Sequence, residues 1–465
     1  MDKKETLFAE LEKAYRARTP KSLALNRRAG VSMIKGGSHN LRLWRPYPFF
    51  MAGASGAEVE DVDGHVYVDY WQGHYANVLG HDPAAVRDAL ERSDPGRIAL
   101  HSGFEGESQV RLAETILGAL GYDDFKIRFT TAGTLAAMYA VMLGLAHTGR
   151  DRILKIGGGW HGASPYLLKG VKFHPGLGFD GADSAGVPAA FLDSIDVIPF
   201  NDEERLERII RQKGDRIGCF ILEPVLGAGG FIPASPGYLR LARRLTAERG
   251  IVLIFDEIVS GFRFAPAPVQ TLYGVKPDLT TLGKVIGGGH AVAAVAGRAD
   301  ILDECGNRMP ETRRVLFEGG TFSSHPFYMR SGAAMLEYLK SNAPAIYPRL
   351  AAAGERLRRG IAAAFQAEGL DVVITGGGNE AIPGSSLFML HFPRTALLPT
   401  KAEDLADPAK VDIALREETL KIFLCLRDIH IVHGGGAASF AHSDAHIEKT
   451  LAAYAEAAYV FKKSL

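Results

Sequence analysis

Between residues 60 and 300, short and largely apolar runs alternate with helical stretches, and this alternation restricts the folds open to the chain. The runs do not alternate strictly between polar and apolar residues, which is typical of strands covered on both faces. Helical segments between such strands favour a large α/β domain around a mainly parallel sheet. The predicted strands are residues 126–130, 152–156, 196–199, 217–222, 251–255 and 292–296.

One connecting helix carries clear end signals. Residues 202–213 follow Asn201, a good N-cap, with Glu204 placed to complete a capping box and Gly214 placed to end the helix. A different segment, 171–188, holds four glycines and two prolines. We expect it to form a long surface loop, and such loops in compact domains are often lids.

The pattern changes after residue 330. Helical stretches at 329–341 and 347–366 lead into apolar runs at 372–375, 386–392 and 429–432, and a last amphipathic helix runs from the Ser443 cap to about Phe461. This predicts a smaller α+β domain. We therefore divide the chain into an N-terminal helical segment (1–60), a large domain (61–330) and a small C-terminal domain (331–465).

Charge and cysteine content exclude several classes of protein. Lys plus Arg and Asp plus Glu both number 53 among 465 residues, so the formal charge is zero. Because a balanced chain has no field that attracts polyanions, we expect neither a nucleic-acid nor a membrane partner. The three cysteines lie far apart without a CxxC pair, so we predict no disulfide framework and no metal site.

Two segments bear on the cellular compartment. The first thirty residues alternate charged with apolar residues at helical spacing and lack the apolar core of a signal peptide. Residues 129–149 carry no charge but include several threonines and glycines, so we interpret them as a buried helix rather than a membrane span. We therefore expect a cytoplasmic protein.

Two glycine motifs resemble known sites but lack their context. GGGWHG at 157–162 fits a dinucleotide-binding loop, yet the residues that follow do not predict the helix that such a loop requires. HGGG at 433–436 is similar to an esterase oxyanion loop, but the chain has no G-x-S-x-G nucleophile motif. The hydrolase interpretation therefore fails, and a nicotinamide oxidoreductase stays a weakly supported alternative for GGGWHG.

The stretch from 251 to 289, IVLIFDEIVSGFRFAPAPVQTLYGVKPDLTTLGKVIGGG, is the most informative part of the chain. Asp256 follows an apolar strand, at the end where open α/β sheets bind ligands. Lys284 lies among apolar and glycine residues, and desolvation favours the neutral amine that attacks carbonyls. A nucleophilic lysine and a buried carboxylate are what pyridoxal phosphate needs. On spacing alone, a strand-end cap and a surface lysine explain the two residues equally well.

The same stretch resembles the signature of class III, fold-type I pyridoxal-phosphate enzymes, and among them glutamate-1-semialdehyde 2,1-aminomutases and related aminotransferases. The resemblance runs from about Leu41 to the C-terminus. It is dense at 56–70, at the LGH of 79–81, and at 129–162, 222–233 and 319–332. It implies the fold of that group, with a large cofactor domain and a small C-terminal domain, and pyridoxal 5′-phosphate as the cofactor.

The resemblance also implies roles for individual residues. Lys284 matches the Schiff-base lysine, which is expected to move the proton between the substrate α-carbon and the cofactor. Asp256 matches the partner of the pyridine nitrogen. Gly133 and Thr134 open a helix after a strand, so their N–H groups and the threonine hydroxyl are expected to hold the phosphate.

Other matched positions surround the ring and the substrate. Trp160 matches the aromatic residue that stacks on the ring, and Ile258 is expected on the opposite face. Thr321 matches a threonine that reaches the phosphate of the neighbouring subunit, which implies a homodimer with shared active sites. Arg42 lies near the family's substrate-carboxylate arginine, a suitable fork for a carboxylate, or it is one of two exposed arginines beside Trp44.

Two further candidate site residues, and several differences from the family's usual residues, complete the comparison. His161 is expected to support the site rather than react, and Glu223 is either an active-site glutamate or part of a structural ion pair. The chain has Ala-Gly-Thr-Leu at 132–135 where the family usually has Ser-Gly-Thr-Glu. The C-terminal HIVHGGGAASFAHS has no acid where aminomutases carry one, whereas DSAGVP at 183–188 resembles their gating loop.

These observations lead to an ordered pair of functions. The first is an aminotransferase that moves an amino group from an amino acid or amine to an oxo acid or aldehyde. The alternative is glutamate-1-semialdehyde 2,1-aminomutase, which moves the amine within one substrate and gives 5-aminolevulinate. In both, the partners are small-molecule amines and carbonyl compounds.

Overall fold

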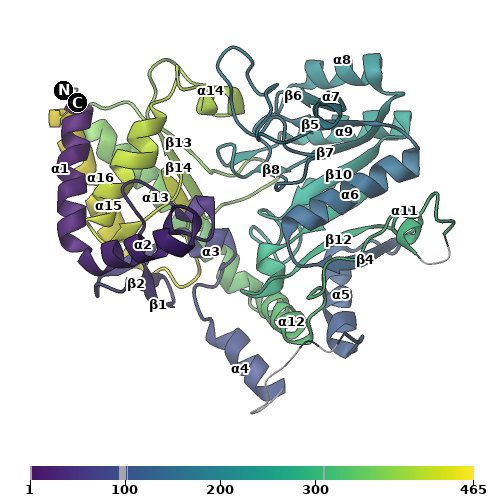
Figure 1. Cartoon of the computed structure of the whole chain (residues 1–465), viewed down its shortest axis with the longest axis horizontal. Coiled ribbons are helices and arrows are strands. Elements are labelled where there is room, and N and C mark those ends of the chain that lie inside the picture. Colours follow the sequence, from purple (N-terminus) through teal and green to yellow (C-terminus); the bar gives the residue numbers. More distant parts are fainter. Residues whose placement is uncertain (1–2, 94–100, 102, 307–308, 465) are drawn as a thin grey trace.

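The structure is a computed structural model that describes residues 3–93, 101, 103–306 and 309–464. Its centre is a seven-stranded sheet in the order β4-β12-β11-β10-β7-β5-β6 (Figure 1). Every strand is parallel to the others except β12, which runs antiparallel to both neighbours. The mainly parallel α/β domain predicted from the sequence is confirmed. The strands are β4 (Phe125–Thr130), β5 (Arg152–Ile156), β6 (Ile195–Ile198), β7 (Ile217–Leu222), β10 (Val252–Glu257), β11 (Leu279–Leu282) and β12 (Ala293–Arg298).

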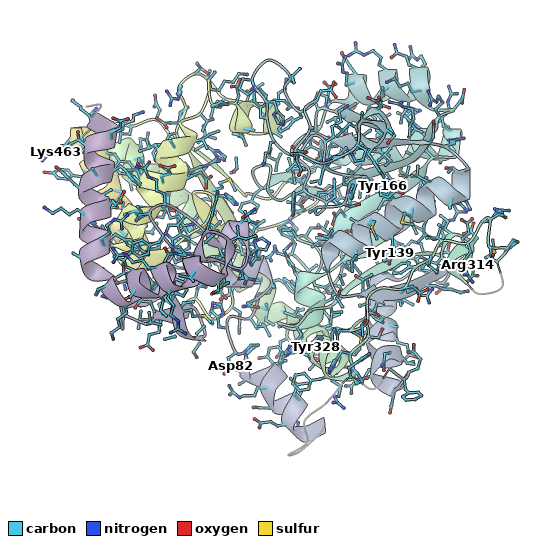
Figure 2. The ribbon with its side chains drawn as sticks, viewed as in Figure 1. Asp82, Tyr139, Tyr166, Arg314, Tyr328 and Lys463 are labelled. Atoms are coloured by element: carbon cyan, nitrogen blue, oxygen red, sulfur yellow. The ribbon has the colours of Figure 1, made fainter. Side chains whose placement is uncertain are left out.

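Both faces of this sheet are covered, which explains why its strands are continuously apolar. In β7 every residue is buried: Cys219 and Ile221 face α6 (Gly133–Thr148), whereas Phe220 and Leu222 face α8 (Glu203–Lys213) and α9 (Pro236–Arg249). Tyr139 of α6, labelled in Figure 2, stacks on Phe317 with ring centroids 4.0 Å apart. The uncharged segment around 129–149 is therefore strand β4 followed by a buried helix.

Two details of the large sheet differ from the sequence predictions. Strand β11 was not predicted because its two central threonines resemble a spacer, yet Thr280 and Thr281 are fully buried. The predicted cap Asn201 is wrong: Asp202 caps α8 by accepting a hydrogen bond from the Arg205 N–H (2.9 Å), which also removes the capping box predicted for Glu204. Asn201 instead adopts a left-handed backbone and binds the turn at 233–235.

The N-terminal and C-terminal parts of the chain form a second body, and the two termini lie side by side (Figure 1). Helix α1 (Lys3–Arg18) buries Leu7, Phe8, Leu11 and Tyr15 against α15 (Leu420–Cys425) and α16 (Asp444–Ser464). A four-stranded sheet in the order β1-β2-β3-β15 joins the two ends, because β15 pairs in parallel with β3. Its strands are β1 (Met51–Ser55), β2 (Glu58–Asp61), β3 (Val66–Asp69) and β15 (Ile429–His430).

The remaining C-terminal elements include the two long helices and the last helix expected from the sequence, α12, α13 and α16. The division of the chain at residues 60 and 330 stays a prediction. Residues 157–188 contain no helix or named strand, as expected for the loop at 171–188 and for GGGWHG. Within the described ranges, no helix is long and apolar enough to span a bilayer.

The other elements are α2 (Pro20–Ser32), η1 (Ile34–Gly36), η2 (Asn40–Arg42), α3 (Gln72–Tyr75), α4 (Ala84–Ser93), α5 (Glu107–Leu120), α7 (Ala189–Asp193), β8 (Val225–Leu226), β9 (Ile232–Pro233), α10 (Gln270–Tyr273), η3 (Lys284–Gly287), α11 (Ala299–Leu302), η4 (Asp303–Cys305), α12 (Pro326–Ser341), α13 (Ala343–Ala367), β13 (Val373–Thr375), β14 (Leu387–His391), α14 (Ala402–Ala406), η5 (Leu415–Thr419) and β16 (Gly435–Ala437).

Candidate active site

A cavity of about 260 Å³ lies at the carboxyl ends of the parallel strands, where open α/β sheets bind ligands. Asp256 reaches it from the end of β10, and Lys284 from the residue that begins η3 just after β11. Eight of the residues singled out from the sequence line this cavity together: Gly133, Thr134, Trp160, His161, Glu223, Asp256, Ile258 and Lys284.

Lys284 occupies an unusual backbone position. Its φ is +49°, a left-handed value that is uncommon for a residue with a side chain and that clusters at functional sites. Burial lowers the pKa of Lys284 to about 8, against the opposing charges of Asp256 and Glu223. A considerable fraction of this amine is therefore neutral near physiological pH, which is the form that attacks a carbonyl carbon.

Asp256 is held in a buried hydrogen-bonded pair. Its Oδ2 lies 2.8 Å from Nδ1 of His161, and its Oδ1 accepts from the Ile258 N–H (3.1 Å). The imidazole of His161 is also buried, and its Nε2 has no partner among the described residues. His161 thus fixes the orientation of the carboxylate, and its supporting role in the reaction stays a prediction.

Glu223 binds the backbone of Trp160 rather than forming an ion pair. Its Oε1 accepts from the Trp160 N–H and its Oε2 from the Gly227 N–H, both at 2.9 Å. None of the ion pairs among the described residues includes Glu223, so the structural ion pair considered from the sequence is not found. Burial, together with the nearby charge of Asp256, raises the pKa of Glu223 above its usual range.

The first turn of α6 borders the cavity and presents backbone N–H groups that no side chain caps. Ala132 at the N-cap offers no side-chain hydrogen bond, so the first N–H groups of the helix are available to an anion. Gly162 lies directly against this turn, because a Cβ there would be 2.4 Å from the Thr134 hydroxyl oxygen. The residues at 132–134 and 162 therefore form a narrow cradle at the positive end of the helix.

Trp160 and Ile258 line the same cavity. The indole of Trp160 is 41% exposed, so a large part of it is available to a ligand. Ile258 packs tightly against two glycines: a Cβ would come within 3.1 Å of it at Gly133 and within 2.9 Å at Gly283. A side chain at either glycine would push Ile258 out of place. The placement of Trp160 and Ile258 on the two faces of the cofactor ring remains a prediction.

Two predicted residues lie outside the cavity. Thr321 is in an exposed turn and does not line the cavity of its own chain. Arg42 lines a separate cavity of about 430 Å³, where its Nε donates to His74 Nε2 (3.4 Å) and its Nη1 to Ser38 Oγ (3.1 Å). The sequence analysis missed His74, which approaches Arg42 from a segment thirty-two residues away.

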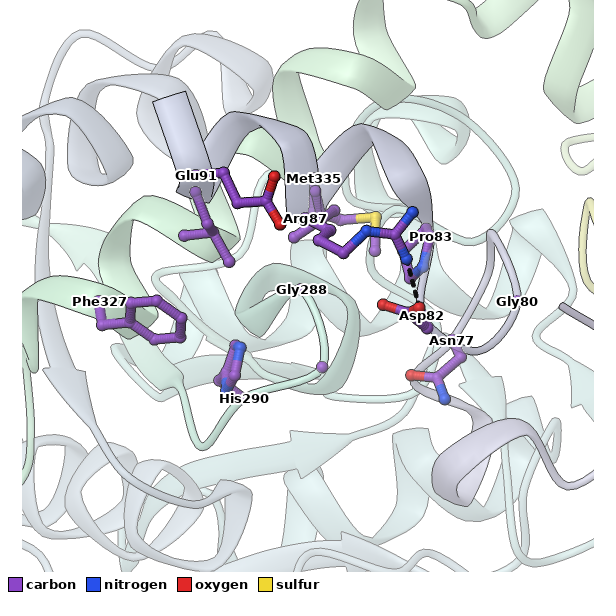
Figure 3. Close-up of a pocket in the computed structure, with 13 residues that line it drawn as sticks. Asn77, Gly80, Asp82, Pro83, Arg87, Glu91, Gly288, His290, Phe327 and Met335 are labelled. Atoms are coloured by element: carbon purple, nitrogen blue, oxygen red, sulfur yellow. Dashed lines mark hydrogen bonds and ion pairs between the residues drawn. The ribbon is translucent and has the colours of Figure 1, made fainter. Parts of the chain in front are cut away.

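His290 is a further cavity residue that the sequence analysis missed. It also lines a larger hollow of about 790 Å³ (Figure 3), in which Arg87 and Asp82 form an ion pair. Its ring stacks on Tyr328, which is labelled in Figure 2, with centroids 4.9 Å apart. The one available signal was its place directly after the glycines of the VIGGG motif.

Fold and site together define a pyridoxal-phosphate enzyme of fold type I, and the residues present fit that cofactor. The partly neutral Lys284 suits its carbonyl, the oriented Asp256 suits its ring nitrogen, and the cradle at α6 suits its phosphate. The unpartnered Nε2 of His161 is a polar atom buried beside the cavity, as expected where a polar ligand completes a site.

Comparisons with known proteins agree. The family described as "Aminotransferase class-III" matches residues 42–373. The glutamate-1-semialdehyde 2,1-aminomutase of Methanothermobacter thermautotrophicus is 36% identical, over 94% of this chain and 98% of that protein. An omega-transaminase from Sphaerobacter thermophilus has a TM-score of 0.84 at 30% identity, covering 95% and 98% of the two chains. A transaminase solved with PLP bound has a TM-score of 0.82 at 28% identity, covering 96% and 98%.

The chain belongs to the class III aminotransferase family, and its cofactor is pyridoxal phosphate. The fold, the class of enzyme and the cofactor expected from the sequence are thereby confirmed. Which member of the family it resembles in activity is a separate question, because its relatives include both an aminomutase and transaminases.

Proposed function

We propose that the protein transfers amino groups on small molecules that carry a carboxylate, with Lys284 as the catalytic lysine and Asp256 as the partner of the cofactor ring. The observation that carries this proposal is the meeting of Lys284, Asp256 and the first turn of α6 around one cavity. When bound, pyridoxal phosphate supplies a carbonyl that takes up the amine and a ring that accepts electron density.

Each residue has a definite task in this proposal. The Nζ of Lys284, with its pKa near 8, accepts and returns the proton that moves on the substrate carbon. His161 keeps the Asp256 carboxylate turned toward the ring nitrogen through the 2.8 Å contact. Glu223 holds the backbone of Trp160, so that the indole can cover the ring and exclude water.

The curated relatives favour the intramolecular reaction. Eight of them, at 33–36% identity, are named glutamate-1-semialdehyde 2,1-aminomutase. This supports the aminomutase, the alternative of the sequence analysis, better than the aminotransferase placed first there. We therefore propose the aminomutase as the first activity to test.

A specific observation keeps the aminotransferase as a second candidate. The cavity that contains Arg42 is lined mainly by apolar and aromatic side chains, among them Trp44, Phe49, Phe50 and Trp71. Such a lining suits a substrate with a bulky apolar group better than the small, polar semialdehyde. The absence of an acid between residues 431 and 442 points the same way.

We also propose a cytoplasmic homodimer with shared active sites. Thr321 does not line the cavity of its own chain, the next residue Phe322 is exposed, and so is Leu316, five residues before it. An exposed threonine among exposed apolar side chains suits contact with a second copy of the chain. Sedimentation of the loaded protein would test this directly: a monomer that turns over substrate contradicts it.

One experiment separates the two activities. The loaded protein is incubated with glutamate-1-semialdehyde alone, and in parallel with a panel of amines and amino acids plus an oxo acid. Formation of 5-aminolevulinate without a second substrate supports the aminomutase, whereas release of a carbonyl product from a panel donor supports the aminotransferase. Failure of both arms in a protein that contains the cofactor would contradict the proposed function.

A further inference from the structure

The segment Gln72–Tyr75, labelled α3, is a left-handed turn rather than an ordinary helix. Its φ angles are +45°, +61°, +60° and +68°, and three of its four residues carry side chains. Consecutive left-handed residues other than glycine are unfavourable for L-amino acids. Such a turn persists only where its surroundings hold it, and strain of this kind is concentrated at functional sites.

The first end of the turn is fixed by Asp69. Its carboxylate accepts from the N–H groups of Trp71 (3.0 Å) and Gln72 (2.8 Å). The carboxylate is itself held by His81 (2.9 Å) and His430 (2.8 Å). The start of the turn is therefore tied to a fully hydrogen-bonded buried acid.

The other end of the turn is fixed by Arg263. This guanidinium is buried and pairs with no carboxylate among the described residues. It donates instead to the carbonyl oxygens of Tyr75 and Val259, the second at 3.0 Å. Because Val259 lines the cofactor cavity, Arg263 connects the left-handed turn to the wall of the active site.

The residue that this turn presents is His74. Its Nε2 accepts from Nε of Arg42 at 3.4 Å, and its ring lies 4.1 Å from the ring of Trp71. The charged or titratable groups that face it are Arg42, His39 and Lys284, all of them bases. Burial and these neighbours lower the pKa of His74 to about 4. The imidazole is therefore neutral at physiological pH and able to accept a hydrogen bond.

We propose that His74 is a positioning residue for carboxylate recognition, and that the strained turn exists to hold it against Arg42. The contact to His74 occupies Nε of Arg42, and Ser38 takes one proton of Nη1. Nη1 and Nη2 each keep an N–H, and together they form the end-on fork that binds a carboxylate in two places. The proposal rests on the proposed function, because it assumes that Arg42 binds the substrate carboxylate.

The test compares two substitutions at position 74. Asparagine tolerates a left-handed backbone but is too short to reach Arg42, so His74→Asn removes the contact and keeps the turn. Glutamine can offer an oxygen acceptor at greater reach, so His74→Gln should restore part of the function. His446→Asn, a histidine of α16 on the C-terminal body, is the matched control.

Binding is measured first, by calorimetric titration of the loaded protein with sodium benzoate and with its uncharged analogue benzamide. For His74→Asn we expect benzoate to bind about tenfold more weakly, the loss of one charge-assisted contact, with benzamide unchanged. His74→Gln should lie between it and the wild type. Equal affinity of wild type and His74→Asn for benzoate, or an equal loss for benzamide, would overturn the proposal.

Kinetics give the second readout. For a carboxylate substrate, His74→Asn should raise KM about tenfold and leave kcat nearly unchanged, because the contact acts on binding. Arg42→Ala is the reference variant. If it binds benzoate as the wild type does and still transfers amino groups, the role proposed for His74 is wrong and the proposed function is unaffected. If the wild type transfers no amino group at all, the proposed function fails, and the benzoate titration still decides the role of His74.

Discussion

At the scale of single residues, the central feature is an amine made reactive by its surroundings. Lys284 lies on a strained backbone in the wall of the active-site cavity, where burial disfavours its charged form. The neighbouring carboxylates Asp256 and Glu223 limit this effect, so the pKa of Lys284 falls to about 8 and no further. Its neutral and charged forms are then both accessible, as a residue that alternately attacks and carries a proton requires.

This pKa sets the pH dependence of cofactor loading. Only the neutral amine attacks the carbonyl, so the rate at which apoprotein takes up pyridoxal phosphate should rise with pH around a midpoint near 8. An ordinary lysine would give a midpoint of about 10.4. The measurement is the growth of visible absorbance after mixing, from pH 6.5 to 10.5. A midpoint above about 10 would show that Lys284 is not desolvated.

Sequence reasoning reached Asp256 from its place at the end of an apolar strand, where open α/β sheets bind ligands, and Lys284 from its apolar and glycine-rich surroundings and the family resemblance. It did not reach His74, because its contact with Arg42 depends on a left-handed turn that no periodicity signals. His290 was not predicted for a similar reason, because its place in the cavity depends on the turn after η3. Residues with a distinctive sequence environment were predictable, whereas contacts that depend on irregular backbone turns were not.

At the scale of elements, the site depends on the close approach of the turn at 160–162 to the start of α6. Gly162 has a φ of +84° and faces the backbone of Thr134, and a Cβ there would lie 2.6 Å from the Thr134 Cα. The turn carries both Trp160 and His161. Any side chain at 162 therefore forces the turn that carries Trp160 and His161 away from the start of α6.

Gly162→Ala should weaken pyridoxal-phosphate binding about tenfold or more, since the new methyl group displaces the N-terminus that holds the anion. The dissociation constant is measured by equilibrium dialysis of the apoprotein. Gly176→Ala is a matched control, because Gly176 has a similar φ of +82° but open space around it. If both variants weaken binding equally, backbone strain rather than the close contact explains the effect.

The strands of the large sheet illustrate what apolar pattern alone can predict. β7 was predicted with its observed bounds because every one of its residues is buried on one face or the other. β11 was missed because threonine supplies β-branching without apolarity, although Thr280 makes a buried hydrogen bond to Gln270 (2.8 Å). The cap of α8 was displaced by one residue because Asn201 and Asp202 are both good caps, and only the local backbone chooses between them.

At the scale of the whole molecule, N-terminal and C-terminal segments pair in one sheet. The parallel pairing of β3 with β15 brings Asp69 against His430, across more than three hundred and fifty residues of sequence. Burial alone would raise the pKa of Asp69, but hydrogen bonds from His430 and His81 outweigh it and hold this pKa well below its usual range. No sequence pattern predicts this pairing, because β3 and β15 were expected in different domains, the large one and the small one.

Asp69→Asn should lower the free energy of unfolding by about 3 kcal/mol, because it removes a buried charge that is fully hydrogen-bonded. Since the pKa of Asp69 is depressed, its stabilisation is complete above the unfolded value of about 4 and is lost as the pH falls below it. The difference from the wild type in urea unfolding should therefore shrink in acid. Asp151→Asn, an exposed acid paired with Arg216 at the surface, should leave stability unchanged. Equal unfolding midpoints for Asp69→Asn and the wild type would show that the ends are held by other contacts.

The most direct test of the account asks which lysine carries the cofactor. The protein loaded with pyridoxal phosphate is reduced with borohydride, digested and mapped by mass spectrometry. Lys155 is a demanding internal control, because it is also buried near the site and burial lowers its pKa to about 8, but it binds the carbonyls of Gly159 and Leu167 and does not line the cavity. The account predicts the cofactor on Lys284 and none on Lys155. Cofactor on Lys155, or on no lysine, would contradict it.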